Sequence, residues 1–325
     1  MKAALYDSHG PAAEVLRLEE LGAPGPGSGE VRVKVAVSAI NPTDYKSRSG
    51  ATPRPMDEFQ IPHHDGAGVI DAVGKGVDPA RVGQRVWLWL AAAGRRWGTA
   101  AEWTVVPGRQ AVPLPDGASM ELGASLGVPA MTAHRCLFAD GPVGGKTVLV
   151  AGGAGAVGHF AIQLARHAGA RVITTVSGPE KAELARQAGA EHVVNYRDPD
   201  AASQIKAIAE RVDRVVEVAL GANLALDLAL ALAGPGTVIV SYAAEPADPV
   251  LPVRACMTAN VVLRFILLYG VPADALDQAA ADVSAALAAG ALTELPSQRF
   301  GLPDIVAAHE AAEAGPVGKI FVIPG

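Results

Sequence analysis

Short apolar segments alternate with longer segments of helical pattern between residues 146 and 242. The first apolar segment is TVLVAGG (147–153) and the last is GTVIVSY (236–242), and the segments between them are rich in alanine, leucine and charged residues. Strands separated by helices of about ten to fifteen residues do not pair as hairpins, and they form β-α-β units instead. This part of the chain is therefore predicted to fold into a doubly wound parallel sheet, which makes the protein α/β in class.

The first third of the chain has a different pattern, with short β-type segments and frequent glycine and proline. EVRVKVAVSAI (30–40) alternates and then becomes apolar, as a strand does when it enters a core. Further short strands are predicted within 66–77 and 82–90, and the chain closes on the apolar segment GKIFVIP (318–324). We therefore expect a β-rich domain built from both ends of the chain, with the parallel-sheet domain inserted between them.

Composition narrows the class of function. The 325 residues include 27 Lys and Arg against 33 Asp and Glu, so the chain lacks the excess of basic residues typical of nucleic-acid binding. Cys136 and Cys256 are too few for a disulfide scaffold. No signal-peptide pattern opens the chain, and the apolar stretch 261–271 is too short to span a membrane. We expect a cytoplasmic protein that binds neither nucleic acid nor membrane.

The loop between the first predicted strand of the parallel sheet and the following helix has the sequence VAGGAGAVG (150–158). Its glycines have the G-x-G-x-x-G spacing of dinucleotide-binding loops, where they permit a tight turn, close approach of a pyrophosphate and close helix–strand packing. The helix that follows directs its N-terminal amides at the phosphates. The predicted cofactor-binding residues of this loop are Gly153, Ala154, Gly155, Ala156, Val157 and Gly158.

The end of the second predicted strand favours NADPH over NADH. NAD-binding proteins usually place an acidic residue there, about twenty residues after the loop, to bind the ribose 2′-hydroxyl. In RVITTVSGPEKAEL (171–184) the strand ends at Ser177 without a carboxylate, and Lys181 follows one turn into the next helix. Glu180 precedes Lys181 and is expected to point to another face. A hydroxyl and an ammonium group would bind a 2′-phosphate, which a carboxylate would repel.

Several segments, in this order along the chain, resemble a known family. They are NPTDYKSRSG (41–50), HDGAGVIDAVGKGV (64–77), GTAAEWTVVP (98–107), LGVPAMTAHRCL (126–137) and GAEHVVNYRD (189–198), together with the glycine loop. The chain resembles the zinc-free quinone oxidoreductases (zeta-crystallin-like) of the medium-chain dehydrogenase/reductase superfamily.

This resemblance implies a domain organisation and an oligomer. It implies a GroES-like, β-rich catalytic domain at 1–125 and 266–325 and a Rossmann domain at 126–265. It also implies a homodimer formed by edge strands of the two Rossmann domains, near 237–265.

The resemblance implies further contacts to NADPH. In the quinone oxidoreductases a lysine and a tyrosine at the positions of Lys181 and Tyr196 hold the 2′-phosphate, and their separation of fifteen residues is the same here. The positions that the family implies for the nicotinamide half of the cofactor are Thr132, Ser241, Tyr242, Phe265, Ile266 and Lys319.

The segment 41–50 carries the predicted catalytic residues. Zeta-crystallin-like members have DTYIRSG where this chain has DYKSRSG, so Lys46 stands where they have tyrosine, and NPxDYK is more similar to the enone-reducing members. The resemblance implies that Lys46 stabilises negative charge on a substrate carbonyl oxygen and that Asn41 contacts the nicotinamide or the substrate. Tyr45 is a candidate pocket residue or proton donor. The predicted reaction is the reduction of a small quinone or α,β-unsaturated carbonyl compound by NADPH.

No metal is predicted, because the zinc ligands of related dehydrogenases are incomplete. Asn41 replaces their cysteine, His64 is kept, Asp65 stands where they have glutamate, and no third ligand follows. The quinone or enone reductase has two alternatives. One is an enoyl-thioester reductase, for which only Arg95 and Arg96 offer a basic cluster. The other is an NADPH-binding protein with a structural or RNA-binding role.

Overall fold

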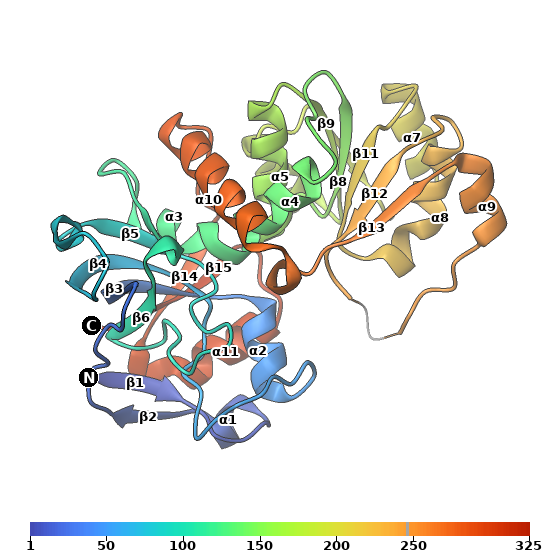
Figure 1. Cartoon of the computed structure of the whole chain (residues 1–325). Helices are drawn as coiled ribbons and strands as arrows, with labels where there is room; N and C mark the ends of the chain where they lie inside the picture. Colours follow the sequence, from blue (N-terminus) through green and yellow to red (C-terminus); the bar gives the residue numbers. More distant parts are fainter. Residues whose placement is uncertain (245–246) are drawn as a thin grey trace. The chain divides into compact units, whose positions relative to one another are not determined.

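The computed structural model of the chain describes residues 1–244 and 247–325. They form two compact units (Figure 1). The first unit comprises Met1–Val128 and Glu294–Gly325, and the second unit comprises Pro129–Thr293. Both ends of the chain therefore contribute to the first unit. No helix in the described ranges is both long and apolar enough to cross a membrane.

A seven-stranded sheet forms the core of the first unit, with the order β14-β15-β3-β4-β5-β7 and with β6 also paired to β3. The long strand β3 pairs antiparallel with the C-terminal strand β15, so that Ile40 lies opposite Ile320. A separate antiparallel pair is formed by β1 and β2. The strands of this unit are β1 (Lys2–Leu5), β2 (Arg17–Glu20), β3 (Glu30–Ile40), β4 (Asp65–Val73), β5 (Arg85–Leu88), β6 (Trp103–Pro107), β7 (Ala111–Pro113), β14 (Ser297–Gly301) and β15 (Lys319–Ile323).

Helix α2 (Pro42–Ser49) follows directly on β3 and positions part of the candidate site. Its start is fixed by a reciprocal cap, in which Asp44 Oδ2 accepts a hydrogen bond from the amide of Asn41 at 2.7 Å. Pro42 occupies the first turn, where its missing N–H is no loss, and Gly50 ends the helix with a φ of 84°. The other α-helices of the first unit are α1 (Ala12–Val15), α3 (Met120–Ser125) and α11 (Ile305–Glu313).

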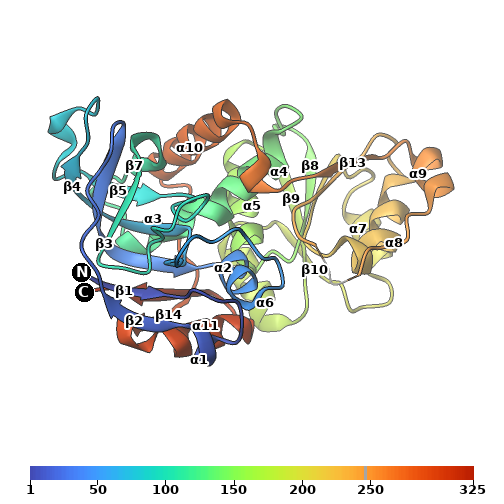
Figure 2. The ribbon, with the colours of Figure 1, turned by 60° about the horizontal axis from the view of Figure 1, so that its bottom comes forward.

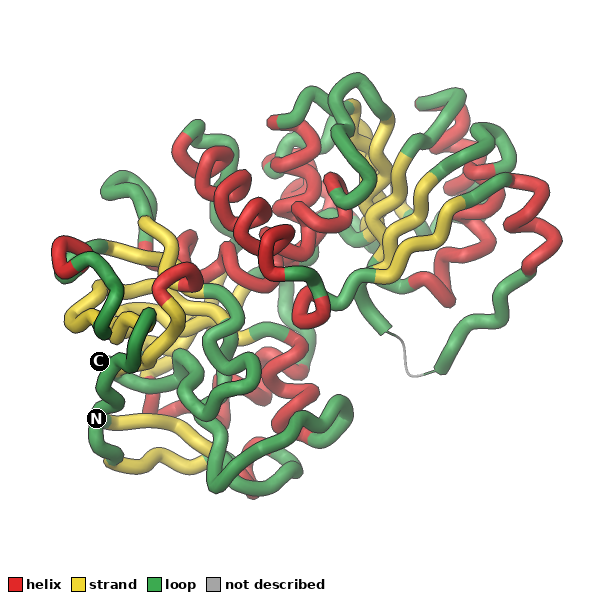
Figure 3. Tube along the Cα trace, in the orientation of Figure 1, coloured by secondary structure: helices red, strands yellow, loops and turns green. Residues whose placement is uncertain are grey.

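The second unit is built on six parallel strands in the order β10-β9-β8-β11-β12-β13 (Figure 3). The order reverses between β8 and β11, which is the arrangement of a Rossmann domain. The predicted doubly wound parallel sheet is therefore confirmed. The strands are β8 (Thr147–Ala151), β9 (Arg171–Val176), β10 (His192–Asn195), β11 (Arg214–Glu217), β12 (Val238–Ser241) and β13 (Val262–Phe265).

Helices cover both faces of this sheet (Figures 1 and 2). On one face α5 packs against β8 and β9. On the other face, side chains of α7 and α8 form an apolar cluster with the strands, which includes Leu149, Ile173, Ile205 and Leu224. The helices are α4 (Met131–Phe138), α5 (Ala156–His167), α6 (Pro179–Gln187), α7 (Ala201–Ile208), α8 (Leu220–Ala231), α9 (Val253–Ala259) and α10 (Ala273–Ala288).

Helix α10 belongs to the second unit, which extends to Thr293, whereas the Rossmann range predicted from the sequence ended at residue 265. The helix packs against α4 and α5. Its buried face includes Leu276 and Val283, and His134 of α4 contacts Asp282 at 2.8 Å. The apolar pattern of a helix shows which face is buried and does not show which domain covers it.

Candidate functional site

A tight loop joins β8 to α5 in the second unit. Gly152 has a φ of 70°, in the left-handed region that residues with a side chain rarely adopt. A Cβ atom on Gly153 would lie 2.1 Å from Thr174 Oγ1, and one on Gly158 would lie 2.3 Å from the Gly152 carbonyl oxygen. The turn and the close packing of loop, strand and helix thus require glycine at these positions.

The N-terminus of α5 is open to an anion. Gly155 is its N-cap, and no capping side chain from the described part of the chain binds the amides of the first turn. These amides have no partner within the helix, and the helix dipole adds partial positive charge there. The loop lies at the carboxyl end of β8, beside the point where the strand order reverses. It can therefore hold the pyrophosphate of a dinucleotide.

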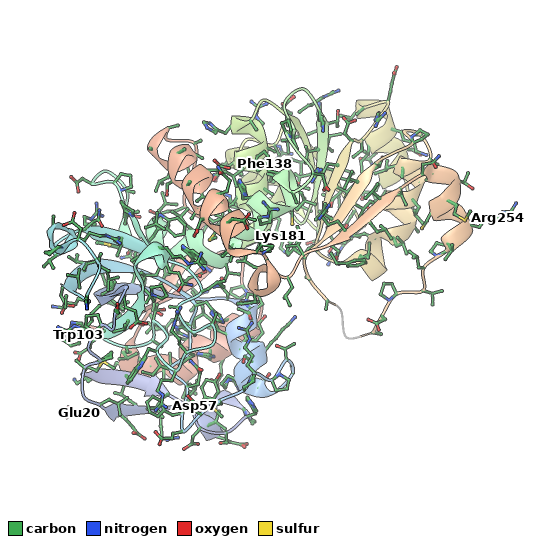
Figure 4. The ribbon with its side chains drawn as sticks, viewed as in Figure 1. Glu20, Asp57, Trp103, Phe138, Lys181 and Arg254 are labelled. Carbon is green, nitrogen blue, oxygen red and sulfur yellow. The ribbon has the colours of Figure 1, made fainter. Side chains whose placement is uncertain are left out.

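The ends of β9 and β10 bring the predicted 2′-phosphate residues to one edge of the sheet. Val176 pairs with Asn195, and the amide of Tyr196 donates to the Val176 carbonyl oxygen at 3.1 Å. Ser177 and Tyr196 therefore follow paired residues at the same edge. Lys181, labelled in Figure 4, lies in the first turn of α6. Its side chain is exposed.

These side chains are available to a ligand. Lys181 and Tyr196 are exposed, and across residues 1–244 and 247–325 their side-chain polar atoms form neither a hydrogen bond nor an ion pair. Arg197, which directly follows Tyr196, is exposed and also lacks a side-chain partner in that part of the chain. Arg197 was not predicted as a site residue, although a basic residue two positions after a strand of this sheet was the available signal.

Strands β11, β12 and β13 lie on the other side of β8, and their carboxyl ends are aligned with one another. Glu217 pairs with Ser241, and Ser241 pairs with Phe265. The amide of Tyr242 donates to the Glu217 carbonyl oxygen at 3.2 Å, and the amide of Ile266 donates to the Ser241 carbonyl oxygen at 2.9 Å. Burial raises the pKa of the Tyr242 hydroxyl, whereas the side chain of Phe265 is 69% exposed. The predicted nicotinamide-side residues 241, 242, 265 and 266 are thus neighbours.

A buried acid pair adjoins this edge and was not predicted. Glu217 Oε1 accepts hydrogen bonds from the amide of Ala219 at 2.5 Å and from Asn223 Nδ2 at 2.9 Å. Asp227 of α8 is buried close to it. Burial, together with the nearby Glu217 carboxylate, raises the pKa of Asp227 well above its usual value.

Thr132 is buried in the first turn of α4. A π-helical turn at Leu126–Ala130 precedes this helix and contains Pro129, whose missing amide suits the wider turn. Pro129 is also the first residue of the second unit. The structure therefore places Thr132 just after an irregular turn, a feature that recurs at functional sites.

In the first unit, Asn41 is the centre of a buried hydrogen-bond network. Its Nδ2 donates to Asp65 Oδ2 at 2.7 Å, and its Oδ1 accepts from Lys319 Nζ at 2.9 Å. Lys319 Nζ also donates to the Ile40 carbonyl oxygen at 3.2 Å. The two oxygens of Asp65 accept from the amide of Val128 at 2.9 and 2.8 Å. Because a carboxylate can only accept and an ammonium can only donate, the partners fix the orientation of the Asn41 carboxamide.

Burial sets the charges of this network. It raises the pKa of Asp65 to about 6 and that of Asp44 to about 7, and the nearby Lys319 ammonium opposes both increases. Burial also lowers the pKa of Lys319, and the two carboxylates oppose that decrease. At neutral pH the Asp65 carboxylate is ionised and bound by N–H groups, whereas Asp44 is close to the midpoint of its titration. The network therefore holds Asn41 in one orientation at neutral pH.

A second buried chain of hydrogen bonds fixes His63, which has a φ of 76°. Thr99 Oγ1 donates to the Asp65 carbonyl oxygen at 2.6 Å, so Ser38 Oγ donates to Thr99 Oγ1 at 2.7 Å and His63 Nδ1 donates to Ser38 Oγ at 2.8 Å. Burial lowers the pKa of His63 well below its usual value, so its ring is neutral. His63 Nε2 therefore accepts from His309 Nε2 at 3.0 Å. This chain determines the tautomer of both histidines.

The two other predicted catalytic residues lie on α2 with different surroundings. Tyr45 packs against the apolar cluster that includes Leu5 and Ile305, and burial raises the pKa of its hydroxyl. Lys46 is half-buried, and its ammonium has no hydrogen-bond or ion-pair partner in the described ranges. The structure thus joins Asn41 to Lys319 and leaves Lys46 available, and the roles of Tyr45 and Lys46 stay predictions.

A cavity of about 260 Å³ lies in the first unit. Its lining includes Asp44 and Ser47 from α2 and His63 and His64, which precede β4. Arg54 and the 92–96 segment complete much of the remaining wall. Because Asp44 binds the amide of Asn41, the cavity adjoins the network around that residue.

Known proteins are similar to this chain over nearly its whole length. The family model described as zinc-binding dehydrogenase matches residues 156–285, and that of the alcohol dehydrogenase GroES-like domain matches residues 27–116. The quinone oxidoreductase of Lama guanicoe is 30% identical over 316 residues, which are 95% of this chain and 94% of that protein. The chain belongs to the quinone oxidoreductase branch of the medium-chain dehydrogenase/reductase superfamily. The family predicted from the sequence is thereby confirmed.

Solved structures have the same fold as this member of the quinone oxidoreductase branch. A mycobacterial protein complexed with NADPH is 30% identical, with a TM-score of 0.84, and the match covers 100% of both chains. The quinone oxidoreductase of Escherichia coli complexed with NADPH is 25% identical, with a TM-score of 0.85 and the same coverage. The predicted fold class, a GroES-like domain with a Rossmann domain, is confirmed.

One matching family model is described as zinc-binding, but the residues of this chain at the positions of the zinc ligands of related dehydrogenases do not fit a zinc site. Asn41 Nδ2 and Asp65 Oδ2 are bonded to each other, and His64 Nε2 faces the guanidinium of Arg54 at 3.1 Å. A guanidinium can only donate, so it occupies the lone pair that a metal would need. Within the described residues, no three His, Cys, Asp or Glu side chains form a possible metal site.

Proposed function

We propose that the chain is an NADPH-dependent reductase of quinones and α,β-unsaturated carbonyl compounds. The observation that carries this proposal is the glycine loop together with the adjoining end of β9, where Ser177, Lys181 and Tyr196 are offered and the residue at the tip of the strand is not a carboxylate. Two of the similar solved structures are complexes with NADPH, which supports the choice of cofactor. The relatives named quinone oxidoreductase support the choice of substrate class.

When bound, NADPH supplies the hydride, and the residues of the chain supply position and charge. Asn41 has one Nδ2 hydrogen bonded to Asp65 and a second that can orient the nicotinamide or the substrate. Lys46 donates to the carbonyl oxygen on which negative charge develops. Burial keeps the Tyr45 hydroxyl protonated, as a proton donor to the reduced product requires.

Stopped-flow measurement of NADPH absorbance tests this function. The panel is a benzoquinone, a naphthoquinone, an alkyl vinyl ketone and a crotonyl thioester, each repeated with NADH. We expect rapid oxidation of NADPH by the quinones or the ketone and much slower oxidation of NADH. Preferred turnover of the thioester would favour an enoyl-thioester reductase. Tight NADPH binding with no turnover would favour a structural or RNA-binding role.

The variant Lys46→Ala tests the proposed role of that side chain. We expect turnover to fall about 100- to 1,000-fold, as for the loss of one donor to a developing oxyanion, with little change in NADPH affinity. Lys75→Ala, an exposed lysine of the same unit, is the matched control and should leave both quantities unchanged. Equal turnover of Lys46→Ala and wild type would remove Lys46 from the mechanism.

We also propose that the protein forms a homodimer through β13. This strand is the last of its sheet, and its Val262 and Phe265 side chains are exposed. Met257 and Val253 of α9 and the following Leu267 are exposed as well. An uncovered strand edge beside exposed apolar side chains is a surface that a second copy can cover.

Sedimentation velocity tests the proposed dimer. Phe265→Glu should shift the wild-type dimer towards monomer, because the charge would be buried in the interface. Val82→Glu replaces an exposed apolar side chain of the first unit and should leave the dimer unchanged. A wild-type monomer at micromolar concentration would contradict the proposal.

A further inference from the structure

The cavity in the first unit has a positively charged wall that the proposed reduction of a neutral quinone does not use. Arg54 precedes β4, and Arg95 lies in the segment between β5 and β6. Both line the cavity together with His63 and His64. Burial lowers the pKa of His64 to about 3, and the two guanidinium groups contribute to this decrease. His64 is therefore neutral, and the lowering of its pKa by Arg54 and Arg95 indicates that both guanidinium groups are close to the cavity.

Arg95 is a partly buried cation whose hydrogen-bond partners are neutral. Its Nε donates to the Ala91 carbonyl oxygen at 3.2 Å, and its Nη2 donates to the Leu90 carbonyl oxygen at 3.2 Å and to Gln110 Oε1 at 2.5 Å. Its Nη1 has no hydrogen bond within the described residues, and no carboxylate there forms an ion pair with it. Glu30 is near enough to raise the pKa of Arg95, but it binds the amide of Gly27 at 2.9 Å instead.

The neighbouring Arg96 provides a contrast. Its guanidinium lies 3.0 Å from Glu58 and 3.4 Å from Asp57, so two acids balance its charge. Arg54 donates to His64 Nε2 at 3.1 Å and to Thr43 Oγ1 at 3.0 Å. Two carboxyl groups line the same cavity: Asp57, which pairs with Arg96, and Asp44, which burial keeps partly protonated at neutral pH. The wall formed by Arg54 and Arg95 thus carries a net positive charge.

We infer that this cavity binds a carboxylate of the substrate, so that the preferred substrates are unsaturated carbonyl compounds that also carry an acidic group. The inference rests on the proposed function and specifies its substrate class. A guanidinium group binds a carboxylate with two parallel hydrogen bonds, and such charge-assisted bonds are strong where water is excluded. A cavity of about 260 Å³ has room for a carboxylate on a short carbon chain. Arg95 and Arg54 are the specificity-determining residues.

A pair of substrates that differ only in charge tests the inference. In 4-oxopent-2-enoate and its methyl ester, a hydride from NADPH, which becomes NADP⁺, and a proton from water add across the same C=C bond, and no other bond of either substrate breaks. The ester is the better electrophile in solution, so a preference for the acid must come from binding. We expect kcat/KM of the wild type to be at least about tenfold higher for the acid.

Variants assign this preference to the cavity. Arg95→Gln should lower kcat/KM for the acid about 10- to 100-fold, the size of a lost charge-assisted hydrogen bond, and leave that for the ester within about threefold. Arg95→Lys should keep part of the preference. Arg54→Gln should lower it as well, whereas Arg96→Gln, whose charge is already balanced, should not. An unchanged ratio of acid to ester in Arg95→Gln would overturn the inference.

The same assays separate this inference from the proposed function. Turnover of 1,4-naphthoquinone and of the ester with no preference for the acid would overturn the inference and leave the function standing. The wild type could also prefer crotonyl-CoA over crotonyl-N-acetylcysteamine, which lacks the phosphates of CoA, and Arg95→Gln could abolish that preference. This result would also overturn the inference, because the anion bound by Arg95 would then be a phosphate of the carrier and not a carboxylate of the substrate.

A binding measurement covers the case in which no substrate turns over. The saturated acid 4-oxopentanoate should raise the melting temperature of the wild type and not that of Arg95→Gln, and its methyl ester should raise neither. This result would support binding of a carboxylate by the cavity even though the proposed reduction had failed. Equal shifts for acid and ester, or no shift with either, would overturn it.

Discussion

The candidate 2′-phosphate residues of the second unit and the Asn41 network of the first unit differ in burial and in hydrogen bonding. In the second unit Lys181 and Tyr196 are exposed, and in the described chain their side-chain polar atoms have no partners. In the first unit Asn41, Asp65 and Lys319 are buried, and each is bonded to another group. Exposed groups are solvated by water until a ligand displaces it, but buried polar groups must be satisfied by the protein. Substitutions should therefore weaken binding in the second unit and weaken folding in the first.

The largest expected effect is a loss in the free energy of unfolding in the variant Asp65→Ala of the first unit. The substitution leaves the Val128 amide and Asn41 Nδ2 without an acceptor and removes the carboxylate nearest the buried Lys319. The expected loss in free energy of unfolding is about 3–5 kcal/mol, as for the removal of one partner from a buried charged network. Urea titration followed by circular dichroism measures it.

Asp71→Ala is the matched control, because Asp71 lies on the same strand β4 and is partly exposed in its ion pair with Arg32. Its expected loss is about 1 kcal/mol. Similar losses for the two variants would show that the buried network of the first unit is no more important to folding than a surface pair, and the comparison between the units would fail.

A smaller effect with a defined dependence on pH is expected at Asp44. Burial raises its pKa to about 7 in the folded protein, whereas an unfolded aspartate titrates near 3.9. Between these values the folded state holds a proton that the unfolded state has lost, so this group makes the fold less stable as pH rises. Asp44→Asn keeps an oxygen that accepts from the Asn41 amide and removes the titration.

Relative to wild type, Asp44→Asn should therefore gain about 3 kcal/mol more free energy of unfolding at pH 8 than at pH 5. Thermal or urea unfolding at the two pH values measures this difference. Asp116→Asn is the control, since that side chain is fully exposed, and its effect should be small at both values. A difference of opposite sign would show that Asp44 is ionised throughout this range.

Local patterns in the sequence were sufficient for the parts of the fold that depend on near neighbours. The alternation of strands and helices predicted the parallel sheet, and the glycine spacing predicted the loop at the end of β8. Gly152 was not included, because the motif counts Gly153, Gly155 and Gly158, whereas the left-handed turn is one residue earlier. The apolar segment at the C-terminus was predicted as a strand, and β15 confirms it.

Contacts between distant residues could not be predicted in this way. Asn41 and Lys319 were named separately, and nothing in either segment indicates that their side chains are bonded. Asp65 was considered only as an incomplete metal ligand, but it accepts hydrogen bonds from two distant segments. The acid pair Glu217 and Asp227 depends on how α8 packs on its strand, which the apolar pattern of the helix does not specify.

The variant Lys181→Ala tests the other side of the comparison. Loss of the ammonium should lower kcat/KM for NADPH about 10- to 100-fold and leave that for NADH unchanged, because only NADPH carries the 2′-phosphate. The free energy of unfolding should stay within about 0.5 kcal/mol of wild type, since the side chain is exposed. Lys206→Ala, an exposed lysine on α7, is the control. Equal losses with both cofactors would remove Lys181 from the phosphate site.

The smallest effect is expected at Tyr196, where two variants separate hydrogen bonding from packing. Tyr196→Phe removes only the hydroxyl, and a single exposed hydrogen bond to phosphate should change the KM for NADPH about two- to fivefold. Tyr196→Ala also removes the aromatic ring. If the ring positions the cofactor by contact, Tyr196→Ala should raise the KM further, and it should do so for NADH as well. If the two variants behave alike and only NADPH is affected, the residue acts through its hydroxyl alone.

Neither Tyr196 variant should change the free energy of unfolding by more than about 0.5 kcal/mol. A loss as large as that expected for Asp65→Ala would show that the second unit also depends on its candidate residues for folding.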